Sequence, residues 1–181
     1  VYKRQLYRYE NMLYRMDLSG KEIDGFLEHA AGPWFNTMTR PGDHLLQFDP
    51  GDPGRLAAPY YNFSTAAGIN YTVDVSQPPG NRVSIESLSD GTPFEESSLY
   101  SVALNSYRGN GGGGHLTAGA GIPKEELVKR ISWSTDRDIR YYLMEYLLRR
   151  DTLNPSTENN WTCIPAHLTE PASIFDRNIL D

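Results

Sequence analysis

Cysteine is nearly absent from this sequence, because Cys163 is the single one among 181 residues. A chain with one cysteine cannot form an internal disulfide. A lone thiol is typically a small buried residue, and we assign Cys163 no catalytic role. Long apolar runs are missing as well: no stretch reaches the length of a membrane span. The first residues, VYKRQLYRYE, also lack the apolar stretch of a signal peptide.

Positive charge is in deficit. Lys and Arg number 17 against 23 Asp and Glu, which gives a formal net charge of -6. This balance argues against binding of a nucleic-acid polymer, which needs a basic face. It does not exclude a small anionic ligand, because one or two arginines are enough to bind one.

The known catalytic and metal-binding motifs are absent too. None of the histidines at positions 29, 44, 115 and 167 stands at ligand spacing from another histidine, a cysteine or a carboxylate. There is no H-E-x-x-H, C-x-x-C or G-x-S-x-G motif. The glycine run at 111–114 lacks the Lys-Ser/Thr of a phosphate-binding loop, and it does not open a patterned helix. We therefore predict no catalytic residue and no metal ligand in this chain.

What is present indicates one α+β domain over residues 1–181, with a sizeable core. Alternation of Met12, Tyr14, Met16 and Leu18 predicts a half-buried strand. Ser19 and Glu22 fit a capping box at the start of a helix that runs to about Ala31, where Gly32-Pro33 ends it. Further strands are predicted in GINYTVDVS (68–76), from Val83 through Ile85, and in SLYSVALNSY (98–107). The chain begins almost inside a patterned segment, so we expect it to be a piece of something longer.

The second half predicts more helix. PKEELVKRI (123–131) opens with a proline suited to a first helical turn. STDRDIRYYLMEYLLRR (134–150) is the strongest helix signal, with Ser134 or Thr135 as its cap and an apolar stripe of Ile139, Tyr142, Leu143, Tyr146 and Leu147. NNWTCIP (159–165) is predicted to be a last extended segment. Residues 36–59, rich in Pro, Gly and Asp, are interpreted as a long surface loop.

Aromatic residues stand beside amides at two strand ends. Tyr7, Tyr9 and Asn11 lie in one stretch, and Asn105, Tyr107, Arg108 and Asn110 lie in the other, just before the glycines. Rings that stack on a base, with amides that read its edge, are a sensible way to hold a nucleobase. The composition alone favours the other reading, in which the tyrosines are structural and the glycines form a tight turn.

The order of the segments favours the first reading. YRYENMLYRMDLSGKEIDGFLEHAA, GINYTVDVSQPPGNRV, VALNSYRGNGGGG, STDRDIRYYLMEYL and NNWTCIP follow one another along the chain. Together they closely resemble the C-terminal domain of the 5'-nucleotidase family, from about Leu6 to Pro165. The nearest branch is that of the bacterial 2',3'-cyclic-nucleotide 2'-phosphodiesterases with 3'-nucleotidase activity. One such motif is weak evidence, whereas five in the right order are strong.

The resemblance implies a four-layer α/β/β/α fold with mixed sheets and a nucleoside site. The base lies between two rings, here Tyr9 and Tyr107, and an amide, here Asn11, can hydrogen-bond it. Asn110, Gly111 and Gly112 match the family's Gly-rich loop. Many 5'-nucleotidases have an aspartate after the second glycine, and this chain has Gly113 there. That departure fits the cyclic-phosphodiesterase branch better than a strict 5'-nucleotidase.

The resemblance also implies partners that this chain does not contain. An N-terminal metallophosphoesterase domain of the same polypeptide holds two divalent metals and hydrolyses the nucleotide substrate, while this chain binds no cofactor of its own. The arginines that contact phosphate and ribose lie upstream of Tyr9, outside this sequence. The expected location is periplasmic, cell-surface or secreted. The alternative is a non-catalytic ligand-binding or adhesion module that keeps the fold.

Overall fold

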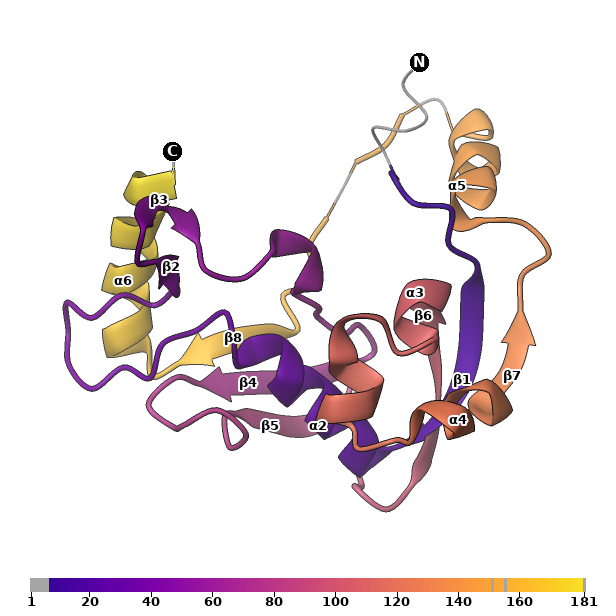
Figure 1. Ribbon diagram of the computed structural model, residues 1–181, viewed down its shortest axis with the longest axis horizontal. Helices are drawn as coiled ribbons and strands as arrows, with labels where there is room; N and C mark the ends of the chain where they lie inside the picture. The colour runs from indigo at the N-terminus through magenta and orange to yellow at the C-terminus, as the bar shows by residue number, and fades with distance from the viewer. Residues whose placement is uncertain (1–6, 151, 155, 181) are drawn as a thin grey trace.

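The computed structural model describes residues 7–150, 152–154 and 156–180, which form helices and short strands arranged in three sheets (Figure 1). The strands are β1 (Leu13–Ser19), β2 (Phe48–Asp49), β3 (Asp52–Leu56), β4 (Ile69–Asp74), β5 (Val83–Leu88), β6 (Leu99–Asn105), β7 (Ile131–Ser134) and β8 (Trp161–Ile164). The helices are α2 (Gly20–Ala31), α3 (Ser106–Gly109), α4 (Lys124–Leu127), α5 (Ile139–Leu148) and α6 (Ala166–Leu180). Short helical turns are η1 (Tyr60–Asn62), η2 (Gly112–Gly114), η3 (His115–Gly119) and η4 (Val128–Arg130).

The predicted α+β class is confirmed. One sheet has the order β6-β1-β7 with antiparallel pairs throughout. The second has the order β5-β4-β8 and is mixed, because β4 pairs antiparallel with β5 and parallel with β8. A two-stranded hairpin of β2 and β3 completes the set. Helix α6 follows β8 and lies beside that hairpin (Figure 1).

Strand β1 and helix α2 form where the local sequence predicts them. Met16 and Leu18 are buried while Arg15 is exposed, so the alternation of β1 sets one face into the core. The capping box is complete: the Glu22 N–H donates to Ser19 Oγ at 3.3 Å, and the Ser19 N–H donates to Glu22 Oε2 at 2.7 Å. These two bonds satisfy amides that a helix start otherwise leaves unpaired.

Helix α2 joins two hydrophobic clusters. One cluster contains its Leu27 together with Tyr71 and Val73 of β4. The other is built on Met16 of β1 and Leu116 of η3. Ile23 and Phe26 of α2 pack against both clusters. The helix is therefore the common wall between the two three-stranded sheets.

A buried ionic network fixes α2 to the β4–β5 connection. The Glu28 carboxylate accepts hydrogen bonds from the backbone N–H groups of Gly80, Arg82 and Val83. The Arg82 side chain is 1% exposed and donates through Nη1 to the Phe35 carbonyl at 2.7 Å. Burial lowers the pKa of Arg82 and the nearby Glu28 charge raises it, so the pair compensates part of its own desolvation cost.

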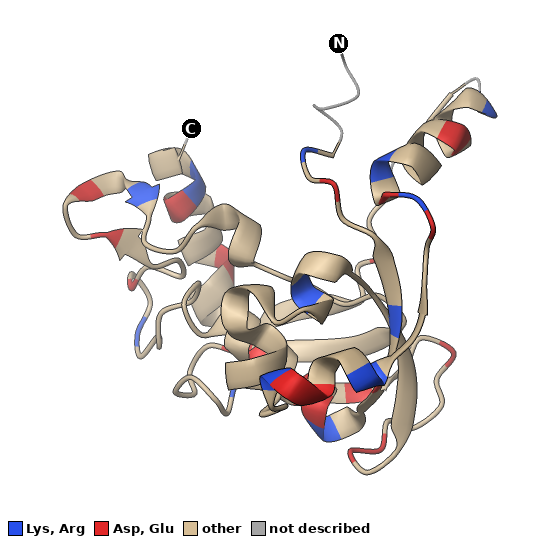
Figure 2. Cartoon of the chain, turned by 45° about the vertical axis from the view of Figure 1, so that its right-hand side comes forward, with Lys and Arg blue, Asp and Glu red and all other residues tan. Residues whose placement is uncertain are grey.

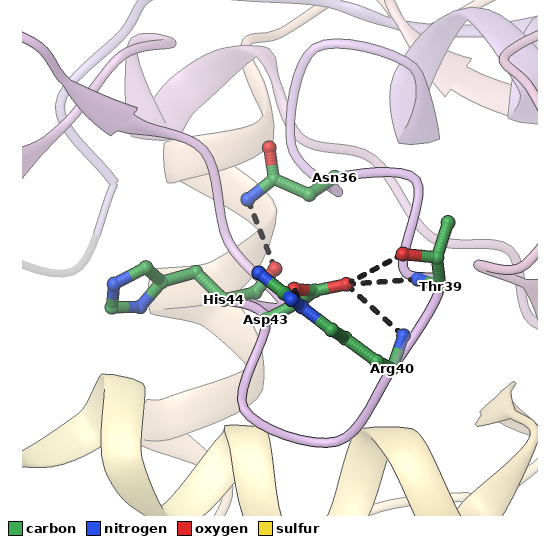
Figure 3. A network of polar contacts seen from close by, with 5 residues as sticks. All are labelled: Asn36, Thr39, Arg40, Asp43 and His44. Atoms are coloured by element: carbon green, nitrogen blue, oxygen red, sulfur yellow. Dashed lines mark hydrogen bonds and ion pairs between the residues drawn. The ribbon is translucent and has the colours of Figure 1, made fainter.

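Residues 36–59 are more ordered than the predicted surface loop, and that prediction is wrong in two respects. Part of the segment forms the β2–β3 hairpin, and Met38 and Leu45 are buried in the first cluster. A polar network closes the intervening turn: the Asp43 carboxylate accepts from Thr39 N at 2.9 Å (Figure 3). This bond holds the pKa of Asp43 below its usual value. Proline and glycine mark turns correctly, but they do not exclude apolar side chains between them from the core.

The helix predicted near residue 134 begins later than expected. Asp138 caps α5 by accepting from Tyr141 N at 2.8 Å. Ser134 instead ends β7, and the Thr135 hydroxyl accepts from Leu13 N at 3.0 Å. The predicted apolar stripe is also largely solvent-facing, since Tyr142, Leu143 and Tyr146 are all exposed. Figure 1 shows α5 beside the N-terminal end of β1 and apart from the β5-β4-β8 sheet.

Two elements have no counterpart in the prediction. Strand β7 has four residues, which is too short for a clear alternation. Helix α6 contains Pro171, and a proline inside a helical pattern normally marks its end. Its buried face consists of Leu168, Ala172 and Asp176, and the aspartate accepts from Leu46 N at 2.8 Å. That partner lies 130 residues away in the sequence, so local pattern does not reveal it.

Charged residues of both signs are interleaved along the ribbon in the view of Figure 2. Within the described residues, no helix combines the length and apolar character that crossing a membrane requires.

The backbones of α2 and η3 approach so closely that an added methyl group between them should destabilise the fold. A Cβ added at Gly25 would lie 2.5 Å from the Gly119 carbonyl oxygen, which is backbone and cannot rotate away. We expect Gly25→Ala to lower the free energy of unfolding by about 1–3 kcal/mol through overpacking. Urea denaturation measures this change. Gly51→Ala is the control, because its Cβ would meet only Asp49 Oδ1 at 3.4 Å. An equal decrease in the free energy of unfolding in the two variants would show that the close α2–η3 contact does not limit side-chain size at position 25.

Candidate functional site

A cavity of about 1040 Å³ lies in the described part of the molecule. Its lining comes from the segment before β1, from α2, from the segment 61–69, and from β6 with α3. The aromatic residues of the lining are Tyr9, Phe26, Tyr61, Phe63, Phe94, Tyr100 and Tyr107. The volume lies at the upper end of the range for small-molecule sites.

Tyr107 reaches this cavity from a helical turn. The sequence predicts that a strand continues through position 107, but β6 ends at Asn105. Asn105 caps α3, because its Oδ1 accepts from Arg108 N at 2.9 Å. The turn leaves the Tyr107 side chain 44% exposed, so the ring is not part of the core.

The glycines make room for the two side chains of α3. A Cβ at Gly112 would lie 2.5 Å from Cε2 of the Tyr107 ring, and one at Gly113 would overlap Nη1 of Arg108. Gly111 and Gly113 also have φ of 90° and 74°, which side chains disfavour. Glycine is thus required both by backbone conformation and by the packing of Tyr107 and Arg108.

Arg108 is the buried anchor of the site. Its Nη1 donates to the Gly112 carbonyl at 3.1 Å, and its Nη2 donates to the Tyr61 carbonyl at 2.9 Å. The guanidinium carbon lies 5.4 Å from the centroid of the Tyr107 ring. Burial lowers the pKa of Arg108, and the Tyr107 phenol raises it. The group joins the Gly-rich loop, the ring of Tyr107 and the η1 turn into one unit.

Tyr9 and Asn11 line the cavity from the segment that precedes β1. Tyr9 is 47% exposed, and its ring stands edge-on to that of Tyr7 with centroids 6.5 Å apart. The Asn11 amide donates from Nδ2 to the Tyr7 hydroxyl at 3.1 Å. From the residues that the structure describes, Asn11 Oδ1 receives no hydrogen bond, which leaves an acceptor at the cavity wall.

The predicted site residues therefore divide into two groups. Tyr9, Asn11 and Tyr107 line the same cavity. The other four are not among the described residues that line it: Asn110 ends α3, Gly111 faces Leu127 and Thr117, and Gly112 and Gly113 make room for Tyr107 and Arg108. The spacing and relative tilt of the Tyr9 and Tyr107 rings stay a prediction.

Two histidines tie this loop to the rest of the domain. His29 of α2 donates from Nε2 to the Gly113 carbonyl at 3.0 Å. His115 is 1% exposed and donates from Nε2 to the Asn62 carbonyl at 2.9 Å. Burial lowers the pKa of His115 to about 4, with the charges of Arg108 and His29 acting in the same direction. His115 is therefore neutral at pH 7 and acts as a structural donor.

Groups suited to covalent or metal chemistry are not gathered here. Within residues 7–150, 152–154 and 156–180, no three His, Cys, Asp or Glu side chains are placed to hold a metal ion. Burial raises the pKa of the Cys163 thiol to about 12, so that sulfur stays protonated at neutral pH.

Sequence reasoning missed Tyr61 and Arg108. Arg108 stands in the quoted stretch NSYRGN, but an arginine beside an aromatic gives no local sign of burial. Tyr61 lies just after the segment interpreted as a surface loop, and its link to Arg108 spans 47 residues. Only the folded chain brings the two together.

Comparison with known proteins places this geometry in a family. The family model described as 5'-nucleotidase, C-terminal domain, matches residues 4–119, more than half of the chain. The trifunctional nucleotide phosphoesterase protein YfkN of Bacillus subtilis is 32% identical over 97% of this chain and 12% of its own length. A 2',3'-cyclic-nucleotide 2'-phosphodiesterase/3'-nucleotidase of Salmonella typhimurium is 29% identical over 90% of this chain and 25% of its own length. The chain thus spans a quarter or less of these curated relatives.

Solved structures agree on the fold. A Staphylococcus aureus structure described as a 5'-nucleotidase superposes with a TM-score of 0.66 at 19% identity, covering 89% of this chain and 29% of that one. The 5'-nucleotidase precursor of Thermus thermophilus gives a TM-score of 0.57 at 20% identity, covering 90% of this chain and 27% of that one. Sequence match, fold and the order of the motifs lead to one conclusion: this chain belongs to the 5'-nucleotidase C-terminal domain family.

Proposed function

We propose that this domain binds the nucleoside part of a nucleotide and positions it for metal-dependent phosphoester hydrolysis on another domain. The observation that carries the proposal is that Tyr9, Asn11 and Tyr107 line one cavity, with both rings about half exposed. Each ring exposed toward a hollow offers a face on which a base can stack. The Asn11 oxygen at the same wall offers an acceptor for an exocyclic amine of the base.

The catalytic group is proposed to lie upstream in the same polypeptide. The described residues gather no metal-binding cluster, and the chain spans only 12–25% of the two relatives named above. An N-terminal metallophosphoesterase domain with two divalent metals would supply the activated water and neutralise the phosphate. This chain's own residues would hold the base, and correct positioning supplies a large share of many rate enhancements.

The substrate proposed is a 2',3'-cyclic or 3'-nucleotide. The name of the Salmonella relative supports this class, as do similarly named proteins from Haemophilus influenzae and Yersinia enterocolitica, at 23% and 24% identity. Gly113 supports it as well. A larger residue there would meet the Arg108 guanidinium, which two backbone carbonyls hold in place. An aspartate, which many 5'-nucleotidases carry at this position, would therefore require the Arg108 side chain to move.

The location proposed is the periplasm, the cell surface or the medium. The family resemblance is the support for this proposal. Fractionation of cells that produce the whole protein is the test.

The domain on its own is expected to be inactive. The reason is that the metal-holding groups are proposed to lie elsewhere. The purified 181-residue protein, incubated with bis-p-nitrophenyl phosphate and Mn²⁺, should release nitrophenol at the rate of buffer alone. Turnover above the buffer control that chelation abolishes would contradict the proposed division of labour.

Nucleoside binding should depend on Tyr107. Stacking contributes about 1–3 kcal/mol per base–aromatic contact, and ordering a free nucleoside costs about 4 kcal/mol or more, so we expect affinity near millimolar. Tyr107→Ala should remove most of this binding while the melting temperature stays nearly unchanged, because the ring is 44% exposed. NMR titration with adenosine and a thermal melt measure the two effects. Equal chemical-shift changes in both proteins would refute stacking on Tyr107.

Gly112→Ala provides a second test that leaves the ring in place. The new Cβ would occupy the position of the Tyr107 ring edge, so the ring must move away from its present place over the loop. We expect weaker adenosine binding and a stability loss of about 1–3 kcal/mol, because the Cβ would also lie 2.5 Å from the Tyr107 carbonyl oxygen. Gly51→Ala, remote from the cavity lining, should bind like the wild type. Unchanged binding in Gly112→Ala would mean that ring placement does not set affinity.

A further inference from the structure

We propose that Tyr61 is a third aromatic wall of the nucleoside site and contacts the bound nucleoside from the side of Tyr107. The inference rests on the proposed function and names a ligand contact within it. Tyr61 belongs to the η1 turn, is 50% exposed, and lines the cavity together with Tyr9 and Tyr107. Sequence pattern assigns it no role, because it follows a segment of irregular composition.

The backbone beneath Tyr61 is held unusually well for an exposed turn. Arg108 donates from Nη2 to the Tyr61 carbonyl at 2.9 Å and from Nη1 to Asn62 Oδ1 at 3.4 Å. His115 donates from Nε2 to the Asn62 carbonyl at 2.9 Å. Both donors are buried. The Arg108 guanidinium and the neutral His115 imidazole thus hold the main chain of this turn, while the Tyr61 ring itself stays outside the core.

The neighbouring residues of the same turn behave differently. Phe63 packs in the core, with its ring 4.7 Å from that of Trp34. Tyr60 is 70% exposed and is not among the described residues that line the cavity. Tyr60 is thus turned to solvent, whereas Phe63 packs against the core cluster and also lines the cavity. Isolated exposed aromatics are common, but Tyr61 differs from Tyr60 in lining the same cavity as Tyr9 and Tyr107.

The anchor also links Tyr61 to Tyr107. The Arg108 guanidinium that holds the Tyr61 carbonyl lies 5.4 Å from the centroid of the Tyr107 ring. Arg108 is the residue after Tyr107 on α3, so the two rings are supported by one rigid unit. A base stacked on Tyr107 therefore has the η1 turn as its neighbour. An aromatic side chain there excludes water from the edge of the base or ribose and adds contact area.

The test is an adenosine titration of the 181-residue protein and four variants, followed by NMR, with a thermal melt of each. Tyr61→Ala should weaken adenosine binding at least about fivefold, the loss expected for one ring contact. Tyr61→Phe should bind within about twofold of wild type, because the proposal assigns the contact to the ring. Tyr146→Ala on α5 is the control: Tyr146 is 49% exposed and is not among the described residues that line the cavity, so this variant should bind like wild type. Tyr107→Ala reports on the proposed function itself.

The outcomes separate the two proposals. Wild-type affinity in Tyr61→Ala, with binding lost in Tyr107→Ala, would overturn the role of Tyr61 and leave the nucleoside site standing. Absence of any adenosine binding by wild type would overturn both. If Tyr61→Ala melts early, wild-type protein with ¹³C-labelled tyrosine rings decides the matter: adenosine should shift the Tyr61 ring signals and give cross-relaxation to them. Unmoved Tyr61 signals beside shifted Tyr107 signals would refute the inference.

Discussion

The close packing of helix α2 against the Gly-rich segment is the constraint on which the rest of the structure depends. Gly25 and Gly119 bring the two backbones together, and a side chain at either position would meet the backbone of the other. Because the approach is so close, Ile23 and Phe26 can contact both hydrophobic clusters at once. The helix thereby fixes the β6-β1-β7 sheet relative to the β5-β4-β8 sheet, and the cavity lies where residues from both sheets face each other.

The same helix reaches the candidate site through hydrogen bonds. His29 holds the Gly113 carbonyl, the adjoining Gly112 carbonyl accepts from Arg108, and Arg108 holds Tyr61. Arg108 is buried and His29 is partly buried, and each donates to a backbone carbonyl, so no link depends on a fully exposed side chain. An aromatic ring carried by such a chain of contacts is placed by the core even though the ring itself is exposed. Placement of this kind reduces the ordering cost when a ligand binds.

Local features of the fold were predictable and distant partners were not. The alternation of β1 and the Ser19–Glu22 capping box are complete within about ten residues, and both appear as expected. Helix α6 was missed because Pro171 interrupts its pattern and Asp176 pairs with residues 130 or more positions away. Strand β6 was extended too far because Asn105 acts as a helix cap, a role that alternation does not reveal. The hydrophobic pattern of a segment thus identifies a strand or helix. Where that element ends depends on which side chain accepts a hydrogen bond from the backbone N–H groups at its terminus.

In the candidate site, too, some residues could be predicted from the sequence and others could not. The order of motifs in a family resemblance suggested Tyr9, Asn11 and Tyr107, and composition alone would have left them as structural residues. In the folded chain Gly112 leaves space for the Tyr107 ring and Gly113 leaves space for the Arg108 guanidinium, so the glycines act through the side chains of α3. Under the proposed function, the domain would recognise its substrate mainly through aromatic faces, and the phosphate would be held elsewhere.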